Sequence, residues 1–311
     1  MSSNQGPVAR LVQPSGPLYA EAMKSSVTIG TEDGFPLGGT LWQGDGDGPL
    51  VLISSATAVP QGLYARFATA LMEAGARAVL TYDYRGTGLS PRPQGWSRRI
   101  DYKEWALRDF PAACRTLSAV DPDREMVGLG QSHGGHAFGL SGVSDRFSRY
   151  AMVATMSGYL GLLDDRWAWA RMNLVGVPVS LLFRDTPRWM GIGEPMPSSC
   201  FRDWARWCRM ENYFFDDPDL PETARYAEVR TPVLAIGLTD DPWATPRAVD
   251  HFMVRHSNAP VEQRWITPQE AGGRVGHLGF FRSRFAETLW PPLIRWLLTG
   301  EEMKIGTRKA G

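Results

Sequence analysis

Short, continuous apolar runs alternate along this chain with segments whose apolar residues recur at helical spacing. Runs without polar alternation are typical of strands that are buried on both faces of a parallel sheet. The intervening helical segments indicate helices that cross over between such strands. The pattern therefore predicts an α/β protein with a mostly parallel central sheet and helices on both faces. The predicted strands are residues 50–53, 78–82, 126–129, 150–156, 233–238 and 261–266, and the predicted helices are residues 63–73, 102–117, 246–254 and 280–298, the last bent or broken at Pro291-Pro292.

Two parts of the chain depart from this alternation. Ahead of the first buried run, residues 26–29 and 37–43 flank a turn at residues 32–36, which predicts a hairpin. Later, residues 159–226 contain five tryptophans and several prolines but no clear strand, which predicts an inserted, mostly helical cap over the carboxyl edge of the sheet. The predicted organisation is a flexible N-terminal arm (1–23), a core (24–158 and 227–300), the inserted cap (159–226) and a C-terminal tail (301–311).

The most informative stretch is residues 126–139, MVGLGQSHGGHAFG. An apolar run ends in a Gly-x-Ser-x-Gly pattern centred on Ser132, and residues at helical spacing follow. Strand, tight turn and helix are the setting in which this pattern presents an exposed serine nucleophile. Gly130 and Gly134 allow strand and helix to approach closely, and the helix N-terminus supplies amide donors for a developing anion. Ser132 is therefore the candidate nucleophile.

An activated serine needs a base, and the chain offers five histidines. His251 and His256 lie in or just after a predicted helix, where a solvent-facing role is expected. His136 is one turn into the helix after Ser132 and is interpreted as structural. For His133, directly after the serine, the backbone amide matters more than the ring. His277 remains, in a glycine-rich loop after the last predicted strand, where a base could reach over the sheet edge.

The base in turn needs an orienting acid on a loop that follows a strand. Residues 233–238 lead directly into Asp240 and Asp241, so either aspartate is a candidate. The order Ser, Asp, His, with each residue after a strand, is the order of the α/β-hydrolase triad. Three signals that are weak alone become strong in this order.

Composition narrows the partners. The chain has 311 residues with 33 basic and 33 acidic side chains, which gives no electrostatic footprint for nucleic acid or an anionic membrane. The uncharged stretch 172–183 is too short to span a bilayer, and the N-terminus lacks a secretory signal pattern, so a cytoplasmic protein is expected. Three cysteines without C-x-x-C spacing indicate neither a disulfide framework nor a zinc site. The oligomeric state stays open, a homo-oligomer included.

Four motifs give the chain a resemblance to a known family. Over residues 25–300 it resembles the α/β-hydrolases, and it is most similar to a bacterial branch of serine hydrolases. Similarity to that branch implies no particular substrate. The resemblance rests on the loop DYRGTGLS (83–90), the elbow GQSHGG (130–135), the turn DDP (240–242) and the loop GHLGFF (276–281). It implies the α/β-hydrolase fold and a Ser132, His277 and aspartate triad.

The resemblance also assigns further roles. It implies an oxyanion hole that uses the backbone N–H of His133 and an amide in the loop after residue 53, for which Thr57 is favoured and Ala56 stays open. Because the acid in similar enzymes lies shortly before a proline, Asp241 is favoured over Asp240, whose carboxylate would hold the turn. Asp83 and Arg85 are interpreted as structural supports of the elbow.

These expectations combine into one function with alternatives. The chain is expected to hydrolyse a carboxylic ester, less readily an amide or thioester, of a small to medium apolar acyl substrate, without metal or organic cofactor. An acyltransferase would pass the same acyl group to an alcohol or amine. A non-catalytic binding protein on the same scaffold is the alternative from another class.

Overall fold

The computed structural model describes residues 23–309. Its centre is a nine-stranded sheet in the order β1-β2-β4-β3-β5-β6-β7-β8-β9. The five pairings from β4–β3 to β7–β8 are parallel, whereas β1–β2, β2–β4 and β8–β9 are antiparallel. The strands are β1 (Met23–Gly30), β2 (Pro36–Gln43), β3 (Leu50–Ser54), β4 (Ala78–Tyr82), β5 (Met126–Gln131), β6 (Arg149–Val153), β7 (Val233–Leu238), β8 (Val261–Ile266) and β9 (Thr307–Arg308).

Central strands and edge strands differ in burial, as their sequences predict. Every residue of β3, β4, β5 and β7 is buried, because these apolar strands have a neighbour on each side and helices on each face. The edge strand β1 is mostly exposed. The predicted mostly parallel sheet and the N-terminal hairpin are therefore confirmed.

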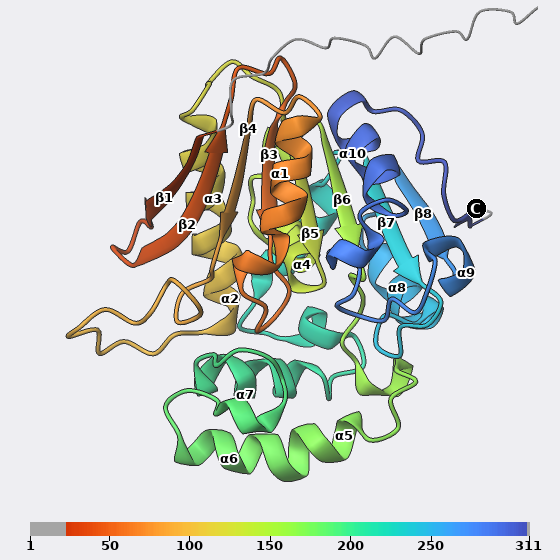
Figure 1. Cartoon of the computed structure of the whole chain (residues 1–311). Coiled ribbons are helices and arrows are strands. Elements are labelled where there is room, and N and C mark those ends of the chain that lie inside the picture. Colours follow the sequence, from red (N-terminus) through yellow and green to blue (C-terminus); the bar gives the residue numbers. More distant parts are fainter. Residues whose placement is uncertain (1–22, 310–311) are drawn as a thin grey trace, which may run out of the picture.

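Helices cover both faces of the sheet (Figure 1). α1 and α10 lie on one face, and α3 and α4 pack on the other, where Phe110 and Phe138 both contact Tyr150 of β6. α2 and α3 are joined without a break by a π-helical turn at Trp105–Asp109. The helices of the core are α1 (Ala65–Glu73), α2 (Tyr102–Glu104), α3 (Phe110–Ser118), α4 (His133–Leu140), α8 (Pro246–Met253), α9 (Pro268–Ala271) and α10 (Trp290–Thr299).

Between β6 and β7 the chain leaves the sheet and forms a helical layer below the carboxyl ends of the strands (Figure 1). The segment 159–226, called the inserted segment below, starts with a 3₁₀ turn (Leu160–Leu162). α5 (Ala168–Ala170), a π-helical stretch (Arg171–Gly176) and α6 (Val177–Leu182) come next and follow one another without a break. A 3₁₀ turn (Arg188–Met190), α7 (Ser198–Trp207) and two further 3₁₀ segments (Tyr213–Asp216 and Pro221–Glu228) complete it.

The structure corrects three local predictions. The last helix does not run from residue 280. α10 begins at Trp290, with Pro291 and Pro292 in its first turn. Proline is tolerated there because the N–H groups of the first turn have no acceptor within the helix, whereas an interior position needs its N–H for a hydrogen bond. β6 ends at Val153 rather than at residue 156. The short edge strand β9 lies in the predicted tail and was not predicted. The predicted flexible arm falls outside the described residues, except Met23, which starts β1.

Candidate active site

Ser132 occupies the sharp turn between β5 and α4. Its backbone has φ 49° and ψ −109°, a conformation that is strained for a residue with a side chain. The flanking glycines make the turn possible: a Cβ on Gly130 would lie 2.2 Å from the carbonyl carbon of Gly134, and one on Gly134 would lie 2.2 Å from the carbonyl oxygen of Ser54. The Gly-x-Ser-x-Gly pattern therefore reflects a steric requirement at this junction.

His277 and Asp241 lie in line with Ser132. The Nε2 atom of His277 is 3.2 Å from the Ser132 hydroxyl, and its Nδ1 is 2.7 Å from Oδ2 of Asp241. An ionised carboxylate can only accept a hydrogen bond, so Nδ1 carries the proton and donates a hydrogen bond to Asp241. Nε2 of the neutral ring then presents a lone pair to the serine hydroxyl, which is the arrangement that a general base requires.

The two neighbouring aspartates make different contacts. The Asp241 side chain is fully buried, which by itself would raise its pKa, but His277 and the amides of Trp243 and Ala244 hold the pKa below its usual value. Asp240 instead accepts hydrogen bonds from the amides of Val275 and Gly276, at 2.9 and 3.1 Å. Asp241 thus contacts the imidazole, whereas Asp240 holds the loop that carries it.

Two backbone amides next to Ser132 are free to donate. The N–H of His133, the first residue of α4, has no acceptor within its helix. In the loop after β3, the Ala56 amide donates to the Tyr64 hydroxyl at 3.1 Å, while the Thr57 amide has no acceptor in the part of the chain described. Both Ala56 and Thr57 line the cavity at Ser132. These contacts favour Thr57 over Ala56 as a donor.

A buried polar chain links the three loops of the site. The Tyr64 hydroxyl accepts from Ala56 and donates to Oε1 of Gln131 at 2.7 Å, and Nε2 of Gln131 donates to the backbone oxygen of His277 at 2.9 Å. Sequence reasoning missed this role. Gln131 stood within the quoted elbow motif, but no local signal in the sequence pairs it with Tyr64, since the two are 67 residues apart.

Ser132 lines a cavity of about 400 Å³ that lies between the sheet edge and the inserted segment. Its walls are mainly apolar, and the described lining residues with charged or titratable side chains are Arg171, His136, His277, Tyr102 and Tyr213. A site of this kind suits an apolar ligand with a few polar groups. The inserted segment contributes Ala168, Arg171, Met172, Val175, Gly176, Trp189, Met190, Gly191, Ile192, Phe201, Trp204 and Tyr213 to the lining.

Comparisons with known proteins are consistent with this architecture. The model of the alpha/beta hydrolase family matches residues 50–289, which is most of the chain. The chain belongs to the alpha/beta hydrolase family. Comparison with the curated proteins gave no significant match. Family membership supports a hydrolase in general; the narrower bacterial branch stays a prediction.

Solved structures with the same fold cover nearly the whole chain. An esterase from Pyrococcus furiosus is 19% identical with a TM-score of 0.59, over 89% of this chain and 91% of that one. An esterase from Exiguobacterium antarcticum is 16% identical with a TM-score of 0.58, over 88% and 99%. A soluble variant of monoglyceride lipase from Saccharomyces cerevisiae is 14% identical with a TM-score of 0.57, over 93% and 99%. At these identities the likeness establishes the α/β-hydrolase fold.

Of the other four histidines of this hydrolase, His133, His136 and His256 are buried, and burial lowers the pKa of each, whereas His251 is only partly buried. His136 donates from Nε2 to the backbone oxygen of Met156 at 2.7 Å, and burial lowers its pKa to about 4. The ring of His133 stacks on Tyr102, which lines the cavity, but His133 itself is not among the lining residues. His256 was expected to face solvent, and this expectation is wrong: it packs against Tyr226 inside the core. His256 lies in the turn that follows α8, and its polar sequence neighbours did not indicate that it would be buried.

Asp83 and Arg85 do not line the cavity. Asp83 accepts from the amides of Gln61 and Leu89 at 2.7 and 2.8 Å, which fixes the loop after β4. The Arg85 side chain is fully buried and pairs with Asp109 at 2.7 Å and with Asp33 at 2.9 Å. Their contacts agree with the structural interpretation made from the sequence.

Replacing Arg85 with methionine is expected to lower the free energy of unfolding by about 3–5 kcal/mol, because it leaves buried carboxylates without their partner. The folded fraction should retain kcat within severalfold of the wild type. Arg98→Met is the matched control, since Arg98 contacts the same Asp33 from a half-exposed position and should cost less than about 1 kcal/mol. Urea unfolding and esterase assays separate the two readouts. A loss of kcat without loss of stability would contradict the structural role.

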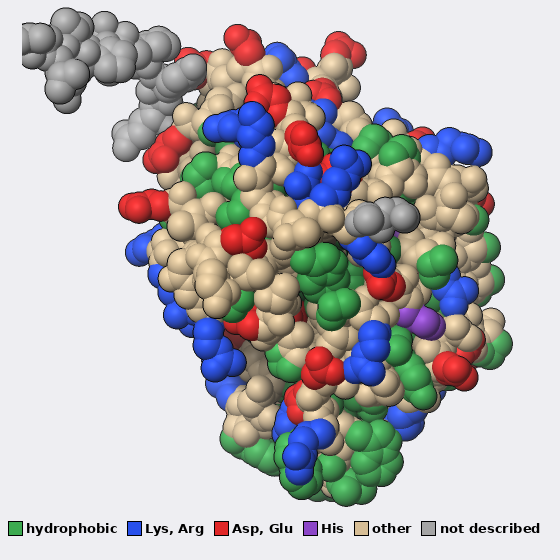
Figure 2. Space-filling view, turned by 90° about the vertical axis from the view of Figure 1, so that its right-hand side faces the viewer, with side chains coloured by type: hydrophobic (Ala, Val, Ile, Leu, Met, Phe, Trp, Pro, Cys, Tyr) green, Lys and Arg blue, Asp and Glu red, His purple; other side chains and the backbone are tan. Residues whose placement is uncertain are grey.

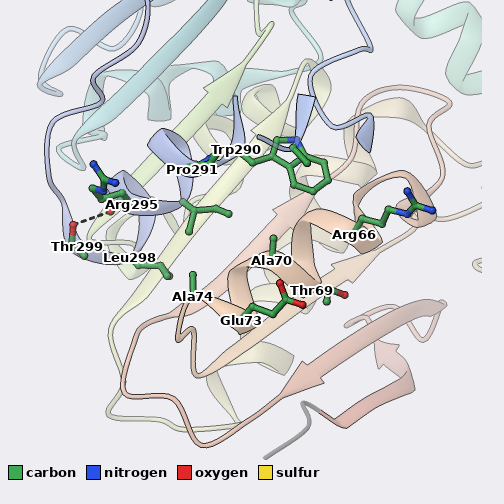
Figure 3. A pocket seen from close by; sticks show the side chains of 12 residues that line it. Arg66, Thr69, Ala70, Glu73, Ala74, Trp290, Pro291, Arg295, Leu298 and Thr299 are labelled. Atoms are coloured by element: carbon green, nitrogen blue, oxygen red, sulfur yellow. Dashed lines mark hydrogen bonds between the residues drawn. The ribbon is translucent and has the colours of Figure 1, made fainter. Parts of the chain in front are cut away.

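A second, larger groove lies elsewhere on the molecule. It holds about 650 Å³ between α1 and α10, and Figure 3 shows Arg66 and Glu73 on one side and Trp290 and Arg295 on the other. None of the described residues that line it also lines the cavity at Ser132. The described residues that line this groove include no nucleophile paired with a base, so the chemistry is assigned to the smaller cavity.

Proposed function

We propose that this protein is a serine hydrolase that cleaves carboxylic esters of small to medium apolar acyl groups through an acyl-enzyme. The observation that carries the proposal is the aligned contact from Ser132 through His277 to Asp241 at the opening of an apolar cavity. The α/β-hydrolase family supplies the setting in which this arrangement acts. The inserted segment serves as the cap that shields the reaction from water.

Each group of the site has a defined role in the formation of the acyl-enzyme. His277 Nε2 removes the proton of the Ser132 hydroxyl as the oxygen attacks the ester carbonyl. The amides of His133 and Thr57 donate to the oxyanion that forms, and each donor contributes on the order of 100- to 1000-fold in rate. His277 then returns the proton to the leaving alcohol. Asp241 keeps the ring in the required tautomer and stabilises its transient positive charge.

Water completes the cycle by the same groups. His277 takes a proton from water as the water oxygen attacks the acyl carbon. When the second tetrahedral intermediate collapses, His277 returns this proton to the departing Ser132 oxygen, and the carboxylic acid is released. The acyl chain lies among apolar side chains of the inserted segment and the core, among them Met156, Met172 and Phe201. Burial of that chain is the source of specificity.

Assays with p-nitrophenyl esters of increasing acyl length test the proposal. We expect kcat/KM to rise about fourfold for each added methylene until the cavity is filled, since each buried methylene contributes about 0.8 kcal/mol. A fluorophosphonate probe should label the protein at Ser132. A flat length profile would contradict acyl binding in this cavity, and absence of labelling would contradict the nucleophile.

A further inference from the structure

The helix formed by residues 168–182 has an unusual distribution of side chains. Its protein-facing stripe consists of Ala168, Met172, Gly176 and Ser180, at intervals of one turn. Its solvent-facing stripe includes Leu174, Val175, Leu181 and Leu182, and the exposed Trp167 directly precedes its first turn. A surface helix normally has polar residues on its solvent-facing side. The outward face is therefore suited to an apolar partner.

This face is the main exposed apolar surface of the described chain. Of eleven exposed large hydrophobic side chains there, eight lie between Trp167 and Trp189. We call these eight the apolar face. In Figure 2 hydrophobic side chains gather at the lower end of the molecule, where the inserted segment lies, with Lys or Arg side chains among them. The apolar face consists of Trp167, Trp169, Leu174, Val175, Leu181, Leu182, Phe183 and Trp189.

The apolar face carries arginines that lack an acidic partner in the described chain. Residues 166–190 hold four arginines and one aspartate, and two of these arginines, Arg171 and Arg188, pair with Asp165 and Glu194 just outside this range. Within the described residues, Arg166 and Arg184 form no ion pair with an acidic side chain. Tryptophan, leucine and arginine together are typical of helices that lie in the interface of an anionic membrane. The equal numbers of basic and acidic residues in the whole sequence gave no indication of these unpaired arginines beside apolar side chains.

The apolar face is continuous with the cavity at Ser132. Val175 and Trp189 are exposed and also line the cavity, and Met172 and Gly176 line it from the buried side of the same helix. A second protein copy seated on this face would cover the mouth of the cavity. A lipid surface would instead deliver acyl chains to it.

We propose that the apolar face docks on an anionic lipid surface, with the helix 168–182 lying in the plane of the interface. Resting on the proposed function, this names the substrate class as an acyl ester of an amphiphile that resides in that surface. The helix is about 20 Å long, so it can lie on the bilayer without spanning it. No helix within residues 23–309 has the length and apolar character of a membrane span.

Cosedimentation of the full chain with vesicles of phosphatidylcholine mixed with phosphatidylglycerol tests the docking. We expect binding that weakens with added salt and with vesicles of phosphatidylcholine alone. Leu181 and Leu182 are 68% and 79% exposed and do not line the cavity, so their replacement should not unfold the protein. The double variant Leu181→Ser/Leu182→Ser should bind about 100-fold more weakly. Arg166→Gln and Arg184→Gln should each weaken binding to the mixed vesicles about fivefold.

The matched control is Val254→Ser, because Val254 is 69% exposed at the end of α8, outside the apolar face, and should bind as the wild type does. Binding is measured in the Ser132→Ala background, which makes it independent of catalysis. The Leu181/Leu182 variant should keep its activity on a water-soluble p-nitrophenyl ester. Vesicle binding without esterase activity would overturn the proposed function and the substrate class but leave the docking surface in place.

Two results would overturn the docking proposal. One is no cosedimentation, or an equal loss in Val254→Ser. The other is a dimer in analytical ultracentrifugation that dissociates in the Leu181/Leu182 variant, which would assign the apolar face to a second copy of this chain.

Discussion

Ser132→Ala is expected to lower kcat for p-nitrophenyl ester hydrolysis by about a millionfold, as loss of the nucleophile does in serine hydrolases. Without the hydroxyl, His277 has no oxygen to deprotonate, and what remains is the contribution of the cavity and the amide donors. The fold should be retained, because alanine suits the strained turn no worse than serine does. Labelling by a fluorophosphonate should be abolished.

The control for this variant is Ser141→Ala. Ser141 is also buried and follows the same helix, α4, but its hydroxyl donates to the backbone oxygen of Phe138 at 2.8 Å. Its loss should cost about 1 kcal/mol of stability and leave kcat within severalfold of the wild type. Activity of Ser132→Ala within about tenfold of the wild type would refute the mechanism.

Asp241→Asn is expected to lower kcat by about 10⁴-fold, in line with the effect of replacing a triad's orienting acid. The asparagine amide can donate to Nδ1 of His277, which would turn the ring to the wrong tautomer and place the proton on Nε2, facing Ser132. The wild-type carboxylate has a lowered pKa, so it stays charged down to pH values below its usual range of about 4. Its contribution to stability is complete above that pH and is lost on further acidification.

Asp240→Asn serves as the neighbouring comparison. It weakens two hydrogen bonds to the amides of Val275 and Gly276, so we expect a loss of about 1–2 kcal/mol in stability and a smaller loss of activity. Steady-state kinetics and urea unfolding of both variants separate the roles. If Asp240→Asn were the inactive protein and Asp241→Asn only the less stable one, our assignment of the acid would be wrong by one residue.

The fold could be predicted correctly because the sheet is encoded by short runs of neighbouring residues. Runs such as Leu50–Ser54 and Val233–Leu238 are apolar throughout, and only a strand covered on both faces buries such a run completely. The Gly-x-Ser-x-Gly pattern carried its own steric reason, because Gly130 and Gly134 have no space for a Cβ. The error at α10 was also local: apolar spacing from residue 280 outweighed the two prolines, which in fact mark where the helix starts.

The sequence by itself determined the sheet, the placement of Ser132 at a strand–helix turn, and the candidates His277 and Asp241, because periodicity and turn residues are encoded by neighbours in the chain. Tertiary structure decided the rest: the contact of Asp241 with His277, the link from Tyr64 through Gln131, and the apolar face of the inserted segment. These features depend on which side chains meet across distant segments and which helix face is left uncovered. A periodic pattern gives the stripes of a helix, but only packing decides which stripe faces the protein and which faces its surroundings.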